Sequence, residues 1–277
     1  MLLISSVLLI LSGLAWEFST RMYLSGFANA VLPFTSSPES KVVAILSWMA
    51  KGPARSTEYF SDDGENRDPV DTLNYKELLT VCGTGTNAFV NLASAGGIEA
   101  RRLLLLDEQN RSTNHVVAEV HIDGRWVVVD PSYHAVLRGK DGHLLTRREL
   151  ANSDVLREAT QNLPDYDLAY NYEHTAFIHV AGLPILGAFL QRMMSAIPPS
   201  WQDSVNLTVL VERQSYDTIV VGIALFLFAI FLQRLVNWYG RKISAVLVSP
   251  WEQLRRSGIA LFSPSNASHP SPRFDVM

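Results

Sequence analysis

Two long apolar stretches bracket this chain of 277 residues and constrain its fold more than any other feature. Residues 218–232 read TIVVGIALFLFAIFL and carry no charged side chain. Extended through Trp238 and Tyr239, the stretch reaches about 33 Å at about 1.5 Å per residue, which is enough to cross a bilayer. Aromatic side chains at such an end are typical of a membrane interface. We therefore predict a transmembrane helix over residues 216–239 rather than a buried core helix.

The second apolar stretch, residues 1–16, also lacks charged side chains. A secretory signal would normally have a basic start, which this stretch lacks. We therefore expect residues 1–24 to be a membrane anchor, with a cleaved, signal-like segment as the alternative. Arg241 and Lys242 follow the other stretch. Because positive charge is retained in the cytoplasm, we expect residues 240–277 to be a cytoplasmic, partly disordered tail and the intervening region to be extracytoplasmic, or periplasmic in a bacterium.

Composition excludes several functions for the intervening region. The net charge of −4 gives no basis for binding nucleic acid. Cys82 is the only cysteine, so neither an intramolecular disulfide nor a cysteine-based zinc site can form. No histidines pair at the i, i+4 spacing of a helical metal site, and the glycines after Cys82 lack the Gly-Lys-Ser/Thr step of a phosphate loop. We therefore expect no metal and no cofactor.

Residues 35–212 show both helix and strand signals, and we expect them to form one domain with a C-terminal extension. The predicted elements, in chain order, are a helix over 36–51, a loop over 57–71, a helical turn over 75–79, a helix over 84–95 stopped by Gly96-Gly97, strands over 101–106, 115–122 and 125–130, a helix over 147–163 and a strand over 205–211. Asp123-Gly124 is a two-residue turn signal that joins two of these strands in a hairpin.

Three residues in this region can carry chemistry together. Cys82 precedes a predicted helix, where backbone N–H groups and the positive helix end stabilise a thiolate. His115 begins the first strand of the hairpin and Asp130 ends the second. Since the strands are antiparallel around Asp123-Gly124, both side chains come near the same open end of the hairpin. A carboxylate there can hold the imidazole in one tautomer and support its protonated form.

The same residues lie in a longer pattern. Cys82 is followed by Gly97-Ile98-Glu99-Ala100-Arg101, then by His115-Val116-Val117-Ala118-Glu119-Val120, then by Gly124-Arg125-Trp126-Val127-Val128-Val129-Asp130-Pro131. Over roughly residues 75–135 this order resembles the transglutaminase-like superfamily, as a bacterial-type, membrane-anchored member. The resemblance implies an α+β, papain-like core in which a helix carrying the cysteine packs on an antiparallel sheet.

The resemblance also implies chemistry. Cys82 would be the nucleophile, His115 the general base and acid, and Asp130 the residue that orients the imidazole, in acyl transfer or hydrolysis at an amide bond of a protein, peptide or other amide substrate. The family includes cross-linkers, amidases and peptidases. A catalytically silent, membrane-anchored binding or scaffold domain of the same fold is the alternative. In either case the membrane, and a membrane-protein partner, are expected partners.

The papain-like pattern places a glutamine, which stabilises the oxyanion, shortly before the cysteine. This chain departs from that pattern, because no glutamine occurs before Gln109. Trp48 is the only tryptophan between Trp16 and Cys82, and its place on a helix face favours core packing. The backbone N–H of Cys82 is therefore the expected donor.

Overall fold

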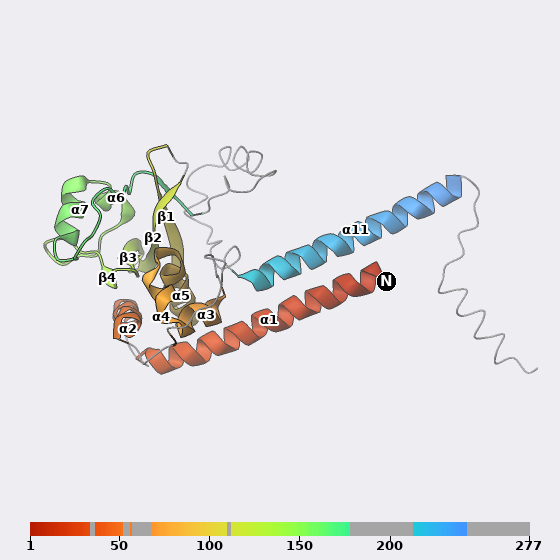
Figure 1. The fold of residues 1–277 in the computed structure, drawn as a ribbon, viewed down its shortest axis with the longest axis horizontal. Coiled ribbons are helices and arrows are strands. Elements are labelled where there is room, and N and C mark those ends of the chain that lie inside the picture. Colours follow the sequence, from red (N-terminus) through yellow and green to blue (C-terminus); the bar gives the residue numbers. More distant parts are fainter. Residues whose placement is uncertain (34–36, 52–55, 57–67, 110–111, 178–212, 243–277) are drawn as a thin grey trace, which may run out of the picture.

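A five-stranded antiparallel sheet organises the domain between the two long terminal helices (Figure 1). The computed structural model describes residues 1–33, 37–51, 56, 68–109, 112–177 and 213–242. The strands are β1 (Ala100–Leu106), β2 (Thr113–Ile122), β3 (Arg125–Asp130), β4 (Ala135–Val136) and β5 (Thr175–Ala176), and their order across the sheet is β4-β3-β2-β1-β5. Thus the three long strands lie together at the centre.

Helix α5 (Cys82–Ala95) packs against the centre of the sheet, and local sequence sets both of its ends. Val81, in an extended conformation, precedes it, so Cys82 is its first residue. At the other end Gly97 adopts a left-handed φ of 75°, and the Ile98 N–H donates to the Ala93 carbonyl at 2.9 Å. A residue without Cβ suits that conformation, which satisfies carbonyls that the helix leaves unpaired.

The hairpin of β2 and β3 turns at Asp123-Gly124, both of which have positive φ, 49° and 78°. Such turns match the twist of the flanking strands and fix their register. Ala118 consequently pairs with Val129, and Ile122 pairs with Arg125. Side chains that alternate along these strands therefore face two separate apolar cores.

One core lies between the sheet and helices α5, α2 (Pro38–Lys51) and α3 (Pro69–Asn74). Its largest fully buried side chain is Phe89, from α5. The core on the opposite face includes Leu103, Val117 and Val128 of the sheet. It is closed by the segment that contains α6 (Arg147–Leu150) and α7 (Ser153–Thr160), through Leu137, Leu145, Leu150, Leu156, Tyr166 and Tyr172. The sheet is thus covered on both faces.

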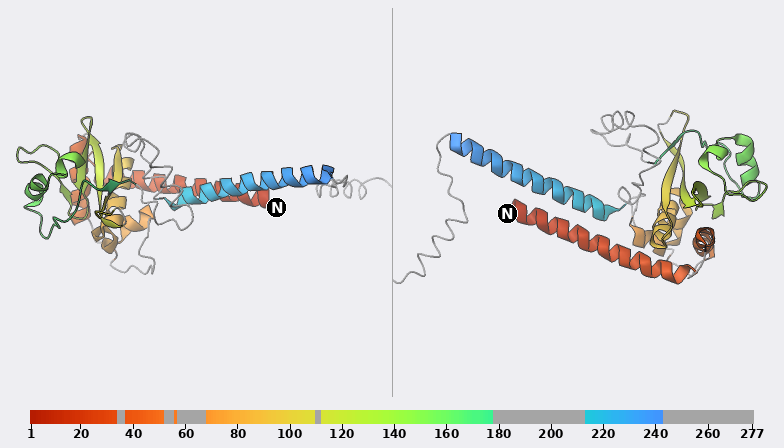
Figure 2. Two further views of the ribbon diagram at one scale, coloured as in Figure 1. Left: turned by 90° about the horizontal axis from the view of Figure 1, so that it is seen from above. Right: turned by 180° about the vertical axis from the view of Figure 1, so that it is seen from behind.

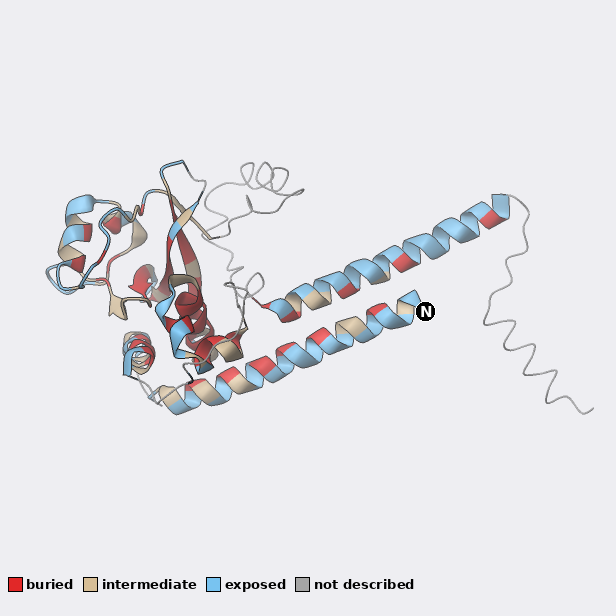
Figure 3. Ribbon diagram, viewed as in Figure 1, coloured by how far each residue is buried: buried red, intermediate tan, exposed pale blue. Residues whose placement is uncertain are grey.

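Two long helices extend side by side from the domain: α1 (Leu2–Val31) and α11 (Gln214–Lys242) (Figures 1 and 2). Both are long and apolar enough to cross a membrane. Most of their surface is exposed, whereas the sheet and α5 are buried (Figure 3). They run antiparallel, since Gly13 faces Ile219 and Gly222 faces Ile10.

Glycines allow the close approach of these two helices. A Cβ at Gly13 would lie 2.7 Å from Ile219 Cγ1, and one at Gly222 would lie 2.7 Å from Ile10 Cγ1. Real Cβ atoms do not tolerate such distances, whereas Gly26 of α1 has open space around it. Small residues at the contact are the usual way for membrane helices to bring their backbones together.

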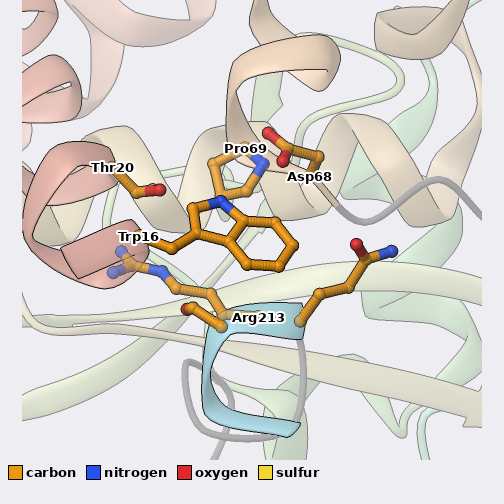
Figure 4. A pocket seen from close by; sticks show the side chains of 7 residues that line it. Trp16, Thr20, Asp68, Pro69 and Arg213 are labelled. Carbon is orange, nitrogen blue, oxygen red and sulfur yellow. The ribbon is translucent and has the colours of Figure 1, made fainter. Parts of the chain in front are cut away.

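A buried polar network fastens the helix pair to α5. Arg213, just before α11, forms an ion pair with Glu17 of α1. Its Nε and Nη2 atoms also donate to Asn91 Oδ1 of α5, at 3.1 and 2.9 Å. Ser215 Oγ donates to Glu17 at 2.8 Å. Trp16 and Arg213 line a small pocket at this junction (Figure 4). The network therefore joins three helices that are distant in the sequence.

The structure differs from the sequence-based expectations at several boundaries. The predicted anchor over residues 1–24 is part of a helix that continues to Val31, because its last turns pack on the domain through Leu24 and Ala28. The predicted loop over 57–71 ends earlier, since Asp68 caps α3 by accepting from the Val70 N–H at 2.7 Å.

The predicted helix over 147–163 was wrong as a single element. It is two helices, α6 and α7, because Asn152 caps the second by accepting from the Asp154 N–H. The turn predicted over 75–79 is α4 (Lys76–Thr80). The strand predicted over 205–211 and most of the tail over 240–277 lie outside the described residues.

A buried ion pair lies in the centre of the sheet. Arg101 of β1 and Glu119 of β2 are opposite each other, with Nη2 and Oε2 2.7 Å apart and both side chains at most 3% exposed. The Arg101 guanidinium also lies between the rings of Trp126 and Phe177, 3.9 and 4.1 Å from their centroids. Removing one charge would leave the other buried and uncompensated.

We predict that Glu119→Leu lowers the free energy of unfolding by about 3–5 kcal/mol, and that Arg101→Met/Glu119→Leu loses less than the single variant. Urea unfolding of the full chain in detergent micelles, followed by circular dichroism, measures both values. Glu99→Leu, at an exposed carboxylate, is the matched control and should change little. A double variant less stable than Glu119→Leu would contradict the prediction.

Candidate active site

Cys82 lies at the N-terminus of α5, against the beginning of β2. The helix is fastened there by Thr86, whose hydroxyl donates to the Val116 carbonyl at 3.0 Å. The Cys82 thiol is only partly buried and interacts with the backbone of Val116 and Gly83. As the first helical residue, Cys82 has a backbone N–H with no helical carbonyl to bind. The thiol therefore lies beside free N–H groups and the positive end of the helix.

His115 and Asp130 come together at the open end of the hairpin. By continuation of the register, Asp130 lies opposite Val117, and His115 lies two residues further along the same face of β2. His115 Nε2 and Asp130 Oδ2 are 2.7 Å apart, and both side chains are buried. The other carboxylate oxygen of Asp130 accepts from the N–H of Ser132 at 3.1 Å. Asp130 is thus held on both sides.

The imidazole connects the carboxylate to the thiol. Its Nε2 faces Asp130, so Nδ1 is the nitrogen left for Cys82. Burial alone lowers the pKa of His115, but hydrogen bonding with Asp130 and with Cys82 outweighs burial and raises that pKa to about 9. Hydrogen bonding with His115 in turn lowers the pKa of the Cys82 thiol, against the smaller opposing effect of its burial. Both shifts favour a thiolate beside an imidazolium.

Four tyrosines surround the His115–Asp130 pair, and none of them was identified from the sequence. Tyr170 stacks on His115 with ring centroids 4.2 Å apart and planes 4° from parallel. Tyr133 meets the imidazole edge-on at 6.1 Å. Burial, Tyr172 and then Asp130 raise the pKa of Tyr166 far above its ordinary value, so it stays a neutral phenol. Nothing in the sequence around Tyr166, Tyr170 and Tyr172 indicates that they lie near His115.

Two tryptophans, Trp48 and Trp126, make their contacts away from the thiol, and Trp48 was expected in the core. Trp48, on α2, packs edge-on against Phe27 of α1 with centroids 4.9 Å apart, so it is part of the core. Trp126 packs over Arg101 and His121. Within the described ranges, no group of three His, Cys, Asp or Glu side chains is placed to hold a metal ion. The three side chains brought together are therefore those of Cys82, His115 and Asp130.

This arrangement can activate a thiol for attack on a carbonyl. A thiolate at a helix N-terminus is the reactive form of cysteine, and an adjacent imidazolium can return a proton to a leaving group. The backbone N–H of Cys82 is available to a developing oxyanion. The carboxylate of Asp130 fixes which ring nitrogen faces the thiol.

Comparison with known proteins agrees with the architecture. Residues 26–131 match the transglutaminase-like superfamily, and the matched region runs from the last turn and a half of α1 to the residue after Asp130. No curated protein and no solved structure matched the chain. The match includes α5 and the three central strands, and it supports the α+β core described above. Over residues 26–131, therefore, the chain is similar to the transglutaminase-like superfamily.

Proposed function

We propose that this protein is a membrane-anchored cysteine enzyme that transfers or hydrolyses an acyl group at an amide bond of a protein, peptide or other amide. One observation carries the proposal: Cys82, at the start of α5, interacts with an imidazole whose other nitrogen is bonded to a buried carboxylate. The match of residues 26–131 to the superfamily supports cysteine chemistry in general. The specific reaction is inferred from the geometry.

The proposed reaction has two steps. Cys82 Sγ attacks the amide carbonyl carbon, the Cys82 N–H stabilises the oxyanion, and His115 gives its Nδ1 proton to the leaving amine. A thioester on Cys82 remains. Water or a second amine then attacks the thioester, and His115 accepts the proton of this nucleophile. The Cys82 thiolate is the leaving group, and the product is the acid if water attacked or a new amide if an amine attacked. Asp130 keeps the imidazole oriented throughout.

A catalytically silent binding domain is the competing proposal, and the burial of the site argues against it. A buried histidine and a buried aspartate cost free energy unless each is well bonded. In a silent domain, apolar residues could fill the same space without that cost. A domain that binds its partner through another surface would also not need a thiol in contact with the imidazole. The arrangement is better explained by chemistry at Cys82.

We predict that Cys82 reacts with iodoacetamide at a lower pH than an ordinary thiol, because its pKa is lowered by His115. His115→Ala should slow alkylation at pH 7 on the order of tenfold, since the thiol loses its charged partner. Loss of intact Cys82, followed by mass spectrometry, gives the rates.

His121→Ala is the matched control, because His121 lies on the same strand and its nearest partners are Glu99 and Trp126. It should leave the alkylation rate unchanged. Equal rates for the wild type and His115→Ala would contradict the activated thiol.

Turnover is predicted only while His115 carries its proton in the resting enzyme. The activity should rise with pH as the thiolate forms, and fall above about 9 as the imidazolium loses the proton that the leaving amine needs. A peptide library with glutamine and asparagine side chains, analysed by mass spectrometry with and without added amine, separates transfer from hydrolysis. Asp130→Asn should reduce either product roughly a thousandfold.

Cys82→Ala is the control for that experiment and should give neither product. If the wild type also gives neither across the pH range, the silent-domain proposal is favoured instead.

We propose further that both long helices cross the membrane and that the domain lies outside the cytoplasm. The helices are antiparallel, so Met1 and Lys242 lie at the same end, away from the domain (Figure 1). Arg241 and Lys242 at that end favour the cytoplasmic side. The pairing of α1 with α11 supports a retained anchor, since cleavage near Ala15 would remove the contacts that Ile10 and Gly13 make with α11.

A topology experiment tests this proposal. In a Cys82→Ser chain, a cysteine placed at the exposed Ser153 should react with a membrane-impermeant maleimide added to intact cells, whereas one placed at Lys242 should react only after lysis. Labelling of Lys242→Cys in intact cells would contradict the proposed orientation.

A further inference from the structure

Tyr170 covers one face of the His115 imidazole. The two rings are parallel to within 4° and 4.2 Å apart, which is a full stacking contact rather than an incidental one. Tyr170 lies beyond residue 131, where the match to the superfamily ends. This contact therefore comes from the segment that closes the second core, not from the matched region.

The position of the Tyr170 ring is fixed by its neighbours. Tyr166 meets it edge-on at 5.4 Å, and the Tyr166 hydroxyl lies 2.9 Å from that of the buried Tyr172. The Tyr133 hydroxyl donates to the Asp165 carbonyl at 3.1 Å. Since Tyr133 follows Asp130 by three residues, this bond ties the tyrosine segment to the end of the strand that carries the carboxylate. The ring and the carboxylate thus approach the imidazole as one assembly.

The stacked ring faces a group that carries positive charge. The negative face of an aromatic ring attracts a cation, and the attraction is strongest where water is excluded. His115 is buried, and the ring covers part of its surface that solvent could otherwise reach. The contact therefore favours the protonated imidazole and prevents rotation of its plane away from Cys82 and Asp130.

We propose that Tyr170 is a positioning residue for the thiolate–imidazolium pair: its ring face holds the imidazole plane between Cys82 and Asp130 and stabilises its charged form. This inference rests on the proposed cysteine chemistry, because it concerns the same site. A simple packing role is the competing explanation, since Tyr170 also contacts the second core.

The pH profile of Cys82 alkylation separates these explanations. The full chain in detergent micelles is treated with iodoacetamide from pH 4 to pH 11, as wild type, Tyr170→Phe and Tyr170→Leu. Phenylalanine keeps the ring face, so its profile should coincide with that of the wild type. Leucine fills similar space without a ring, so alkylation at pH 6 should fall about 3- to 10-fold and the acid limb of the profile should move to higher pH.

Leu168→Ala is the matched control, because Leu168 is exposed in the same segment, and it should leave the profile unchanged. Fluorinated phenylalanines at position 170 provide a second series that preserves packing while weakening the ring face. The acid limb should move to higher pH in steps as the number of fluorines rises. Only chains whose thermal unfolding is unchanged are compared.

The outcomes distinguish the two proposals. A wild-type profile equal to that of a free cysteine peptide would overturn the activated thiol and, with it, the role of Tyr170. A lowered wild-type acid limb with no movement in Tyr170→Leu and in the fluorinated series would overturn the role of Tyr170 alone. Equal movement in Tyr170→Phe and Tyr170→Leu would also overturn it, since the ring face would then be irrelevant.

Discussion

The hydrogen bond between His115 and Asp130 is the interaction on which the site depends. It is possible only because the two-residue turn at Asp123-Gly124 sets the register of the hairpin, and it is buried only because both faces of the sheet are covered. An imidazole held in this way presents one nitrogen to the carboxylate and the other to the thiol. The lowered pKa of the Cys82 thiol therefore depends on both the tight turn and the covered sheet.

Much of this arrangement could be predicted from local signals in the sequence. The turn residues Asp123-Gly124 specify their own backbone conformation, and Gly96-Gly97 marks the end of α5 for the same reason. His115 and Asp130 could be paired by counting residues outward from the hairpin turn, which places both at its open end. Cys82 could be added because it is the only cysteine and precedes a predicted helix. The boundary at Asn152 was missed because a single capping side chain divides a pattern that otherwise continues as a helix.

Contacts between distant segments could not be predicted in this way. Tyr170 follows His115 by 55 residues, and nothing in its neighbourhood indicates that it will meet an imidazole rather than fill the core. Arg213 follows Glu17 by 196 residues and Asn91 by 122, so its partners are set by packing alone. The superfamily match ends at residue 131, and both contacts depend on residues beyond it.

The network of Glu17, Arg213 and Asn91 has a consequence for how far the site can reach. A domain joined to its anchor by a flexible linker can take many positions and orientations relative to that anchor. Here α11 begins directly after an arginine bonded to the helix that bears Cys82, and α1 continues unbroken into the domain. The site is therefore held at one height and one orientation relative to the helix pair. Under the proposed function, only an amide presented at that height and in that orientation would reach Cys82.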